Sequence, residues 1–462
     1  MYLVAGLGVT GQSVLRYFAA QGEPCLAFDT RKSLNISTLQ SQFFQAEFAL
    51  ENLPKSWLKR FDTLVLSPGI AKSEPWVVKL MQQGKQVIGD IELFARTVNA
   101  PVIAITGSNG KSTVTTMTGM ALQAAGYQVG VGGNIGAPVL DLLLDDKSYE
   151  VFVLELSSFQ LETTYSLASC TATVLNISED HMDRYPTMEE YIQAKMQIFS
   201  NTELAVLPEN FSAQGISQHT PISRFGMGDN VIQSEQDFGL ISETKCSERK
   251  GGGEFLGFGK TPVIARSDMA LKGSHHQLNA LAMMALCQMF NVDSAHFKYV
   301  VQTFKGLPHR TQLIGTYNDI DWVNDSKGTN IGATLTAIES LGKQTIEKQS
   351  KGALVLLLGG VSKEADFSAL IPYIQSYCRH TIVFGRDQQR IAQHLIGVDM
   401  TFVKTLEEAA ELAQKIALQG DCVVFSPACA SFDQFANYVQ RGDVFTEKVL
   451  ALHSMSCGDK KC

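Results

Sequence analysis

Short apolar runs alternate along the chain with segments of helical period, which is the pattern of strand-helix-strand units built around parallel sheets. The first group of such units covers residues 2–96, with strands expected at 2–5, 25–28 and 63–66. Turn residues, Ser-Pro-Gly, follow the third strand at 67–69. This group predicts a small, doubly wound sheet.

A second group begins with an apolar strand at 101–105 and continues with strands at 151–154 and 173–175. A β-rich insert is expected from 251 to 265, and a helix at 276–290 ends the group. A third group follows residue 308. Its strands are expected at 353–358, 381–384 and 422–425, with amphipathic helices between them.

A chain of 462 residues is too long for a single hydrophobic core. We therefore expect an α/β protein of three domains: an N-terminal Rossmann-like sheet over 1–97, a central sheet with a small β insert over 98–306, and a C-terminal Rossmann-like open sheet over 307–457. The tail, 458–462, is short, charged and aperiodic, so we expect it to fray.

Composition and charge exclude several classes of protein. Hydrophobic residues at 45% and charged residues at 18% are typical of an ordinary globular protein, and a formal net charge of -8 argues against general binding to nucleic acid. The start of the chain lacks a basic and apolar leader, and no apolar run approaches the length of a membrane span, so we expect a cytoplasmic protein. The nine cysteines are scattered without a C-x-x-C pair, which predicts reduced thiols and no zinc site.

A glycine-rich turn follows the first expected strand. Gly6-Leu-Gly8-Val-Thr-Gly11 fits the G-x-G-x-x-G pattern, and Asp29 ends the next strand. Such a turn lets main-chain amides approach a pyrophosphate, while the acidic residue accepts hydrogen bonds from a ribose or a base. Taken alone the pattern fits a dinucleotide cofactor, any nucleotide diphosphate, or a tight turn whose glycines serve only packing.

A second loop, residues 106–113 with the sequence Thr-Gly-Ser-Asn-Gly-Lys-Ser-Thr, lies between an expected strand and an expected helix. It departs from the strict phosphate-loop pattern because Ile105 replaces the first glycine. It still offers a nest of amides, Lys111 for the β- and γ-phosphates, and the Ser112 hydroxyl for Mg²⁺. The central sheet is therefore expected to be a P-loop ATPase sheet.

An acidic residue, Glu155, comes directly after the strand at 151–154. The carboxyl end of a buried parallel strand is where a carboxylate that holds a metal is expected. A surface glutamate that caps the next turn is the alternative, and further polar residues at 157–160 favour the metal site.

Taken together, these loops make the chain resemble the Mur ligases, in the branch that adds D-glutamate during peptidoglycan synthesis. The resemblance runs nearly end to end and rests on segments that occur in the same order, at residues 6–11, 29–31, 67–69, 106–113, 133–136, 155–160, 176–186, 307–310, 324–327 and 426–435. It implies domains for the uridine nucleotide, for ATP, and for closure over both. It also implies an ATP-dependent reaction in which the carboxylate of UDP-N-acetylmuramoyl-L-alanine is phosphorylated and attacked by the amine of D-glutamate.

The resemblance assigns residues to each substrate by their positions in these segments. Those matched to the UDP-linked substrate are Val9, Thr10, Asp29, Thr30, Arg31, Ser67, Pro68, Gly69, Asn134, Gln160 and His181. Those matched to ATP are Gly107, Ser108, Asn109, Gly110, Lys111, Ser112, Thr113, Asn279, Arg310 and Asp325. Those matched to D-glutamate are Thr329, Lys363, Ser431, Phe432 and Tyr438.

The resemblance also implies two Mg²⁺ sites and a set of catalytic residues. Ser112 and Glu155 match ligands of one ion, and His181 and Lys195 would serve the other. In the family the lysine matched by Lys195 is carbamylated, which turns a cation into an oxygen ligand suited to Mg²⁺. Without that match, Lys195 would be read as a solvated lysine and His181 as an ordinary hydrogen-bonded histidine. Lys111, His181, Lys195 and Lys327 are the expected catalytic residues.

Two positions depart from the family pattern: His276 replaces an asparagine, and Gly328 replaces an alanine. The first puts one nucleotide contact in doubt, and the second adds freedom to the loop that carries Thr329. The alternatives left open are another Mur ligase, a folylpolyglutamate synthase-like ligase, an NAD-dependent dehydrogenase, and a P-loop switch or motor. We expect a monomer with small-molecule substrates only.

Overall fold

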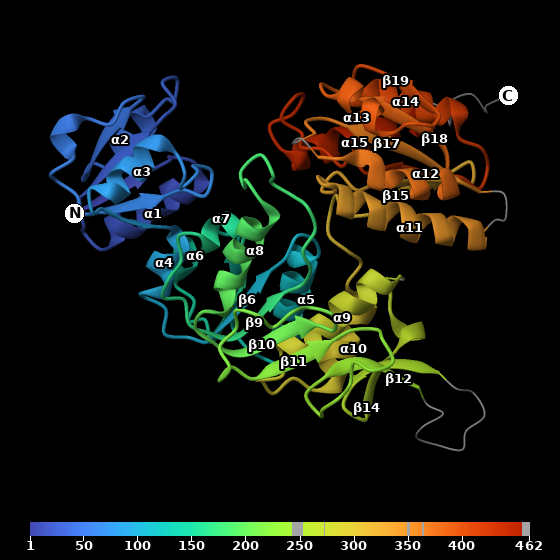
Figure 1. Ribbon diagram of the computed structural model, residues 1–462, viewed down its shortest axis with the longest axis horizontal. Helices are drawn as coiled ribbons and strands as arrows, with labels where there is room; N and C mark the ends of the chain where they lie inside the picture. Colours follow the sequence, from blue (N-terminus) through green and yellow to red (C-terminus); the bar gives the residue numbers. More distant parts are fainter. Residues whose placement is uncertain (243–252, 272, 349–351, 363–364, 455–462) are drawn as a thin grey trace. The chain divides into compact units, whose positions relative to one another are not determined.

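The computed structural model describes residues 1–242, 253–271, 273–348, 352–362 and 365–454. The chain forms three sheets and divides into two compact units (Figure 1). The first unit consists of Met1–Ile177 and Glu189–Phe304, and the second of Ser178–Met188 and the chain from Lys305 onward. The expected α/β class with N-terminal, central and C-terminal sheets is confirmed. The expected fraying tail at 458–462 lies outside the described residues.

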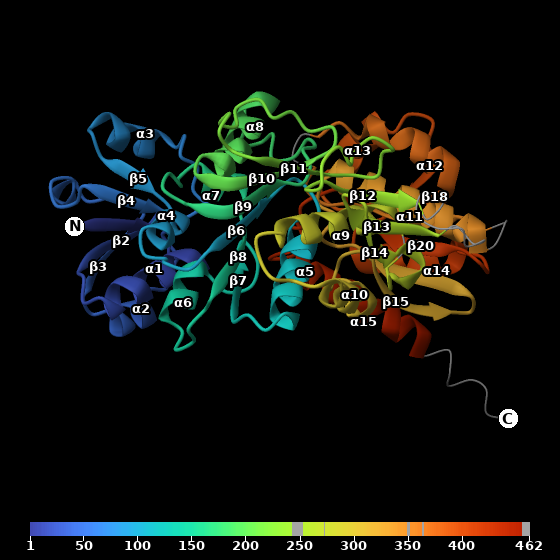
Figure 2. The ribbon, with the colours of Figure 1, turned by 90° about the horizontal axis from the view of Figure 1, so that it is seen from below.

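The N-terminal sheet has five parallel strands in the order β3-β2-β1-β4-β5. The strands are β1 (Tyr2–Ala5), β2 (Cys25–Asp29), β3 (Ala46–Leu50), β4 (Thr63–Leu66) and β5 (Gln86–Ile88). Figure 2 shows α3 (Pro75–Gln82) on one side of this sheet and α1 (Val9–Ala20) and α2 (Ser37–Gln42) on the other. Successive side chains of β1 point to opposite faces of the sheet, which explains the helix layer on each face. Val4 packs with Val14 of α1, whereas Leu3 packs with Val77 of α3.

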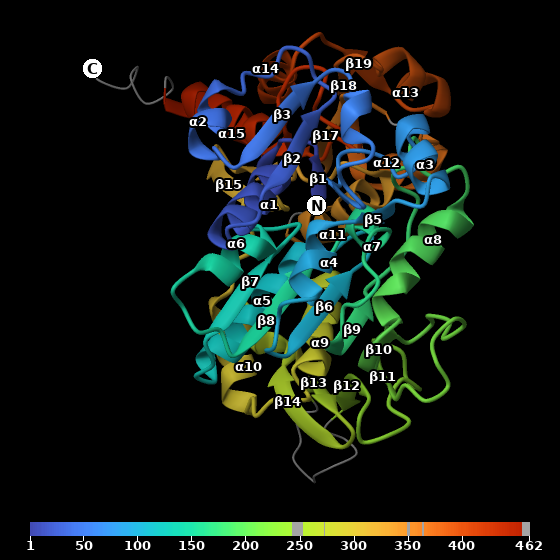
Figure 3. The ribbon, with the colours of Figure 1, turned by 90° about the vertical axis from the view of Figure 1, so that its left-hand side faces the viewer.

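The central sheet has nine strands in the order β14-β13-β12-β11-β10-β9-β6-β8-β7. They are β6 (Val102–Thr106), β7 (Val129–Gly133), β8 (Val151–Glu155), β9 (Ser169–Val174), β10 (Thr202–Pro208), β11 (Ile222–Phe225), β12 (Phe238–Ser242), β13 (Glu254–Phe258) and β14 (Thr261–Ala265). Figure 3 shows the strands from β7 to β11 side by side in this order. The expected β insert continues this sheet, since β13 and β14 pair antiparallel beyond the parallel strand β12.

Helices cover both faces of the central sheet. The helices α5 (Lys111–Ala124), α9 (Ser274–Leu286) and α10 (Ser294–Thr303) pack together on it. The other face, which bears Val102 and Ala104, packs against α4 (Asp90–Ala95) and α6 (Val139–Leu144). The expected helix at 276–290 ends at Leu286, because Cys287 to Phe290 form a turn that leads into the Asp293 cap of α10.

Polar contacts join the N-terminal sheet to the central one within the first unit. Arg16 of α1 pairs with Asp141 of α6, at 2.9 and 2.6 Å. The buried carboxylate of Glu92 on α4 accepts hydrogen bonds from the main-chain amides of Tyr165 and Ser166, at 2.7 and 2.9 Å. These contacts tie helices of the N-terminal sheet to elements of the central sheet within the first unit.

The sheet of the second unit has six strands in the order β15-β16-β20-β17-β18-β19, of which only β15 is antiparallel. They are β15 (Gln312–Tyr317), β16 (Ile320–Asn324), β17 (Leu354–Gly359), β18 (Cys378–Phe384), β19 (Met400–Phe402) and β20 (Cys422–Phe425). Leu356 of β17 packs toward α11 (Ile331–Lys348), α12 (Ile371–Tyr377) and α13 (Gln388–His394). Val355 packs toward α14 (Leu406–Ile416) and α15 (Tyr438–Ser454).

The six cysteines that lie in the described residues are free: Cys25, Cys170, Cys287, Cys378, Cys422 and Cys429. Within the same residues, no helix combines the length and the apolar character that crossing a bilayer requires.

Candidate functional site

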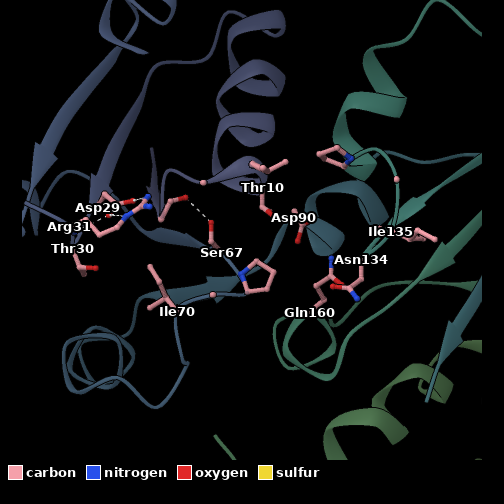
Figure 4. A pocket seen from close by; sticks show the side chains of 18 residues that line it. Thr10, Asp29, Thr30, Arg31, Ser67, Ile70, Asp90, Asn134, Ile135 and Gln160 are labelled. Carbon is pink, nitrogen blue, oxygen red and sulfur yellow. Dashed lines mark hydrogen bonds and ion pairs between the residues drawn. The ribbon is translucent and has the colours of Figure 1, made fainter. Parts of the chain in front are cut away.

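A pocket of about 610 Å³ opens at the carboxyl ends of β1 and β4, between the N-terminal and the central sheet. Ten of the eleven residues matched to the UDP-linked substrate line it: Val9, Thr10, Asp29, Thr30, Arg31, Ser67, Pro68, Gly69, Asn134 and Gln160 (Figure 4). The eleventh, His181, belongs to the second unit. Strand ends of a doubly wound sheet are where such sheets bind ligands, because the turns there expose main-chain amides.

The glycine-rich turn is closely packed. Gly6 has a φ of +87°, in the left-handed region that favours glycine, and a Cβ on Gly11 would lie 1.9 Å from the Gly6 carbonyl oxygen. Ser67 on the neighbouring strand end donates a hydrogen bond of 2.7 Å to the same oxygen. The glycines therefore serve packing, and this packing exposes the main chain at Gly6 and Gly8 to the pocket.

Asp29 is buried and holds the other side of the turn. Its carboxylate accepts a hydrogen bond of 2.7 Å from the Leu7 amide and two of 2.8 Å from the Arg31 guanidinium. Burial alone would raise the pKa of Asp29, but these hydrogen bonds outweigh it and leave the pKa below its usual value. Asp29 is therefore ionised, and it fixes the position of Arg31 at the edge of the pocket.

The second loop connects β6 to α5 and has the form expected of a phosphate-binding loop. Gly107 and Gly110 have φ values of +149° and +81°. Asn176, at the end of the neighbouring strand β9, braces the loop by accepting from the Asn109 amide at 2.8 Å and donating to the Asn109 carbonyl at 3.0 Å. Asn279 on α9 lies against Gly110, where a Cβ would be 3.0 Å from its Oδ1 atom.

Two lysines turn toward this loop. Lys111 donates to the carbonyl oxygens of Gly107 and Ser108, at 2.8 and 2.9 Å. Lys195 on α8 (Met188–Met196) also donates to the Gly107 oxygen, at 2.9 Å, and is only 2% exposed. The loop thus concentrates positive charge where an anion of high charge, such as a triphosphate, would be bound.

Glu155 links the two sites. It is 1% exposed and ends β8, as expected, beside the loop. The Ser112 hydroxyl donates to its Oε2 atom at 2.5 Å, and the Asn134 amide donates to its Oε1 atom at 2.8 Å. Since Asn134 also lines the pocket, Glu155 stands between the pocket and Ser112 of the phosphate loop. Buried carboxylate and hydroxyl oxygens fit a hard cation such as Mg²⁺.

The second unit gathers several of its predicted residues at the carboxyl end of β16. Asp325 accepts hydrogen bonds from the Ser426 hydroxyl at 2.7 Å and the Thr311 amide at 3.0 Å. Burial raises the pKa of Asp325 to about 6, although these donors and the charge of Arg310 favour its ionised form. The Lys327 ammonium lies 4.0 Å from the centre of the Tyr438 ring. Asp325 therefore lies beside Arg310, and Lys327 lies beside Tyr438, within the second unit.

Thr329 and His181 line one small pocket of the second unit. His181 has a φ of +59°, which is costly for a side chain of this kind, and its ring lies 3.6 Å from the Asp180 carboxylate. Asp180 in turn accepts a hydrogen bond of 3.0 Å from Asn330, next to Thr329. Ser431 is buried, and Phe432 is 74% exposed. Lys363 lies outside the described residues.

The residues of one expected set belong to different units. Ser112, Glu155 and Lys195 belong to the first unit and His181 to the second, so the shared metal site of His181 and Lys195 stays a prediction. Among the residues that the structure describes, no three His, Cys, Asp or Glu side chains are grouped as metal ligands would be. The ring of His276, one of the two departures, lies beside that of His275 with 3.9 Å between ring centres and a tilt of 45°. Burial lowers the pKa of His276 to about 3.

Three side chains near these sites were missed by the sequence analysis. Tyr191 hydrogen-bonds Ser108 of the loop at 3.0 Å and lies under Lys195, and its spacing of four residues from Lys195 on one helix was an available signal. Asp90 lines the pocket two residues after the end of β5, and its closeness to a strand end was an available signal. Arg441 is 1% exposed and donates to the Ser326 and Cys429 carbonyls, a burial that nothing local predicts.

Comparisons with known proteins point to one family. Family models match in chain order: "Mur ligase MurD-like, N-terminal domain" at residues 1–89, "Mur ligase middle domain" at 105–287, and "Mur ligase, glutamate ligase domain" at 309–429. A protein from Hydrogenovibrio crunogenus named "UDP-N-acetylmuramoylalanine--D-glutamate ligase" is 54% identical over 460 residues, which cover 100% of both chains. A protein of the same name from Legionella pneumophila is 40% identical over 456 residues, which cover 98% of this chain and 99% of that one.

Solved structures share the fold at lower identity. A MurF ligase from Thermotoga maritima, solved in complex with ADP, has a TM-score of 0.61 and 16% identity, covering 98% of this chain and 95% of that chain. The UDP-N-acetylmuramate-alanine ligase MurC from Thermotoga maritima has a TM-score of 0.59 and 17% identity, covering 98% and 99%. The three-sheet architecture is therefore a shared one.

Proposed function

Because the chain belongs to the Mur ligase family, we propose that it joins D-glutamate to the carboxylate of UDP-N-acetylmuramoyl-L-alanine, with ATP as the energy source and an acyl phosphate as the intermediate. The observation that carries this proposal is the hydrogen-bonded link from Asn134 through Glu155 to Ser112. It joins a pocket large enough for a nucleotide sugar to a loop built for a triphosphate. A reaction between the two ligands requires this adjacency.

In this proposal the first pocket binds the UDP-linked substrate. The exposed main chain of the glycine-rich turn suits a diphosphate, and Arg31, held by Asp29, adds a cation at the edge. Asn134 and Gln160 lie toward the central sheet, where the sugar and the reacting carboxylate would come closest to ATP. His181 would complete the site from the second unit.

The phosphate loop would bind ATP through residues 107–113, with Asn279 on the adjacent helix. Lys111 would leave the Gly107 carbonyl and pair with the β- and γ-phosphates. Two anions must meet in this reaction, so positive charge from Lys111, and from Lys327 of the second unit, would reduce their repulsion. Arg310 and Asp325 would contact the nucleotide from the second unit.

Ser112 and Glu155 would hold one Mg²⁺, with His181 and Lys195 at a second. Mg²⁺ would supply Lewis-acid stabilisation of the phosphoryl oxygens. A carbamylated Lys195 would fit this role because its burial beside the loop brings an oxygen ligand to the phosphates. Thr329, Lys363, Ser431, Phe432 and Tyr438 would bind D-glutamate. We also propose that the enzyme works as a monomer in the cytoplasm, where ATP is available.

The proposal is tested by measuring phosphate release with ATP and Mg²⁺ across a panel of UDP-linked muramoyl acceptors and amino acids. We expect release equal to the amide formed with UDP-N-acetylmuramoyl-L-alanine and D-glutamate, and little release with either alone. Another amino acid as the preferred partner would instead indicate a different Mur ligase. Phosphate release that needs neither partner would contradict the ligase assignment and favour a P-loop switch.

A further inference from the structure

Asp90 is a buried acid in the wall of the first pocket that no motif assigned. It is 3% exposed and begins α4, and within the part of the chain that the structure describes its Oδ1 atom has no hydrogen-bond partner. A buried carboxylate oxygen without a donor is costly, so such a group is kept where a ligand supplies the donor. Asp90 is one of the residues that line the pocket, so a ligand bound there could reach it.

The position of Asp90 is fixed from both sides. The amide of Gly89 donates to the Thr163 carbonyl at 3.0 Å, and a Cβ on Gly89 would lie 2.5 Å from the Thr163 hydroxyl oxygen. On the other side, the Glu92 carboxylate holds Tyr165 and Ser166. Asp90 therefore cannot withdraw from the pocket without breaking the contact between the two sheets.

Gln160, matched to the substrate, is largely engaged within the protein. Its Oε1 atom accepts from the Ser157 amide and hydroxyl, both at 3.1 Å. Its remaining amide group lies against the Asp90 carboxyl group. Gln160 thus orients Asp90, and Asp90 is left with the capacity to accept from a ligand.

Figure 4 shows where along the pocket this capacity lies. Asp29 and Arg31 are at one end, Ser67 and Thr10 follow, and Asp90 lies beside Asn134 and Gln160 at the end toward the central sheet. Burial raises the pKa of Asp90 to about 6, so the group carries a negative charge at neutral pH. A negative group disfavours a diphosphate as its neighbour and favours a hydroxyl or an amide N–H.

We propose that Asp90 is a specificity-determining residue that accepts a hydrogen bond from a hydroxyl or amide N–H of the sugar attached to the uridine diphosphate. This inference rests on the proposed function of the pocket, and it assigns the sugar end of the substrate to Asp90. A site built around a buried acceptor rejects ligands that lack the donor, because the acceptor is then left unpaired.

Calorimetric titration of the full chain with UDP and with UDP-N-acetylglucosamine tests the proposal without relying on turnover. For Asp90→Asn we expect affinity for the sugar-bearing nucleotide to fall roughly tenfold or more, as is typical for the loss of a charged hydrogen bond, while affinity for UDP changes less than about twofold. Equal losses for both ligands, or no loss for either, would overturn the proposal. If neither nucleotide binds the unaltered chain, the proposed function of the pocket fails instead.

Glu92→Gln is the matched control, since Glu92 lies on the same helix with the same burial but its oxygens bind Tyr165, Ser166 and Arg96. We expect this variant to melt at a lower temperature and to bind both ligands with the same ratio of affinities as the unaltered chain. In steady-state assays, Asp90→Asn should raise the KM for the UDP-linked substrate and leave the KM for ATP unchanged. A change in the affinity ratio of Glu92→Gln as large as that of Asp90→Asn would show that the effect is structural, and would reject the proposal.

Discussion

Lys111 and Lys195 donate hydrogen bonds to the same oxygen atom, the carbonyl of Gly107, at 2.8 and 2.9 Å. The two lysines come from different helices, one at the start of α5 and the other near the end of α8. Two ammonium groups on one carbonyl oxygen repel each other, and a bound triphosphate would relieve that repulsion by pairing with either of them. The positions of the two ammonium groups therefore favour the binding of an anion at this loop.

Replacing Lys111 with alanine should remove turnover while leaving the fold intact. Its ammonium group donates to the Gly107 and Ser108 carbonyls of the loop, whereas in the proposed reaction it stabilises charge on the transferred phosphate. We expect kcat to fall by a factor on the order of 10³, typical of a lost transition-state donor. Stopped assays of phosphate and amide would measure this, with Lys343→Ala, an exposed lysine paired with Glu339, as the control. Normal product formation by Lys111→Ala would reject the role.

Replacing Gly11 with alanine should damage the first pocket, because the new Cβ would lie 1.9 Å from the Gly6 carbonyl oxygen. We expect a loss of about 1–3 kcal/mol in the free energy of unfolding, as for other overpacked sites, and weaker binding of UDP. Denaturant melts and calorimetry would measure the two effects. Gly22→Ala is the control, since Gly22 has a φ of +69° but nothing within 4 Å of its Cβ position. UDP binding that is equally affected in both variants would contradict the packing argument.

The sequence was sufficient for features that local spacing determines. Apolar runs located β1, β2 and β4 of the first sheet, β6, β8 and β9 of the central sheet, and β17, β18 and β20 of the third. The loop pattern located Gly107, Lys111 and Ser112 before any contact was known. Glu155 could be singled out because it directly follows an apolar run that predicts a strand. Parallel strands bring their carboxyl ends to one edge of the sheet, where a carboxylate that holds a metal is expected. These inferences need no knowledge of which distant segments meet.

Features that depend on distant contacts were not predictable in the same way. The strands β3 and β5 are short or half exposed and lack a strong apolar run, so they were missed. Asp90 lies just beyond the end of a strand, as the first residue of α4, but its importance appears only once Gln160 and Thr163 are packed near it. Arg441 is a polar residue in a helical pattern, and its burial follows from carbonyls more than ten residues away.

Lys195 should be required as a carbamylated group and not as a cation. Lys195→Arg keeps the positive charge beside Gly107 but cannot be carbamylated, so we expect ligase activity to fall by roughly 10²-fold or more. A short carboxylic acid added to Lys195→Ala should restore part of the activity by supplying the missing oxygen ligand. Lys72→Arg serves as the control, because Lys72 also lies over a tyrosine ring, at 5.4 Å, but away from the loop. Full activity of Lys195→Arg would exclude carbamylation as a requirement.

The stability of the unliganded chain should depend on pH through Asp325. Burial raises its pKa from 3.8 to about 6, so between these values the folded chain keeps a proton that the unfolded chain has lost. Stability therefore falls as pH rises from 4 to 6 and is level above that range. Relative to Asp325→Asn, whose amide does not titrate, the unaltered chain should lose roughly 2–3 kcal/mol over this window. Urea melts of both chains at each pH would measure the difference between their free energies of unfolding. The titration of all other groups is common to both chains and cancels in this difference. The difference in unfolding free energy between the two chains could instead stay constant, or change in favour of the unaltered chain, as pH rises. Either result would show that burial does not raise the pKa of Asp325.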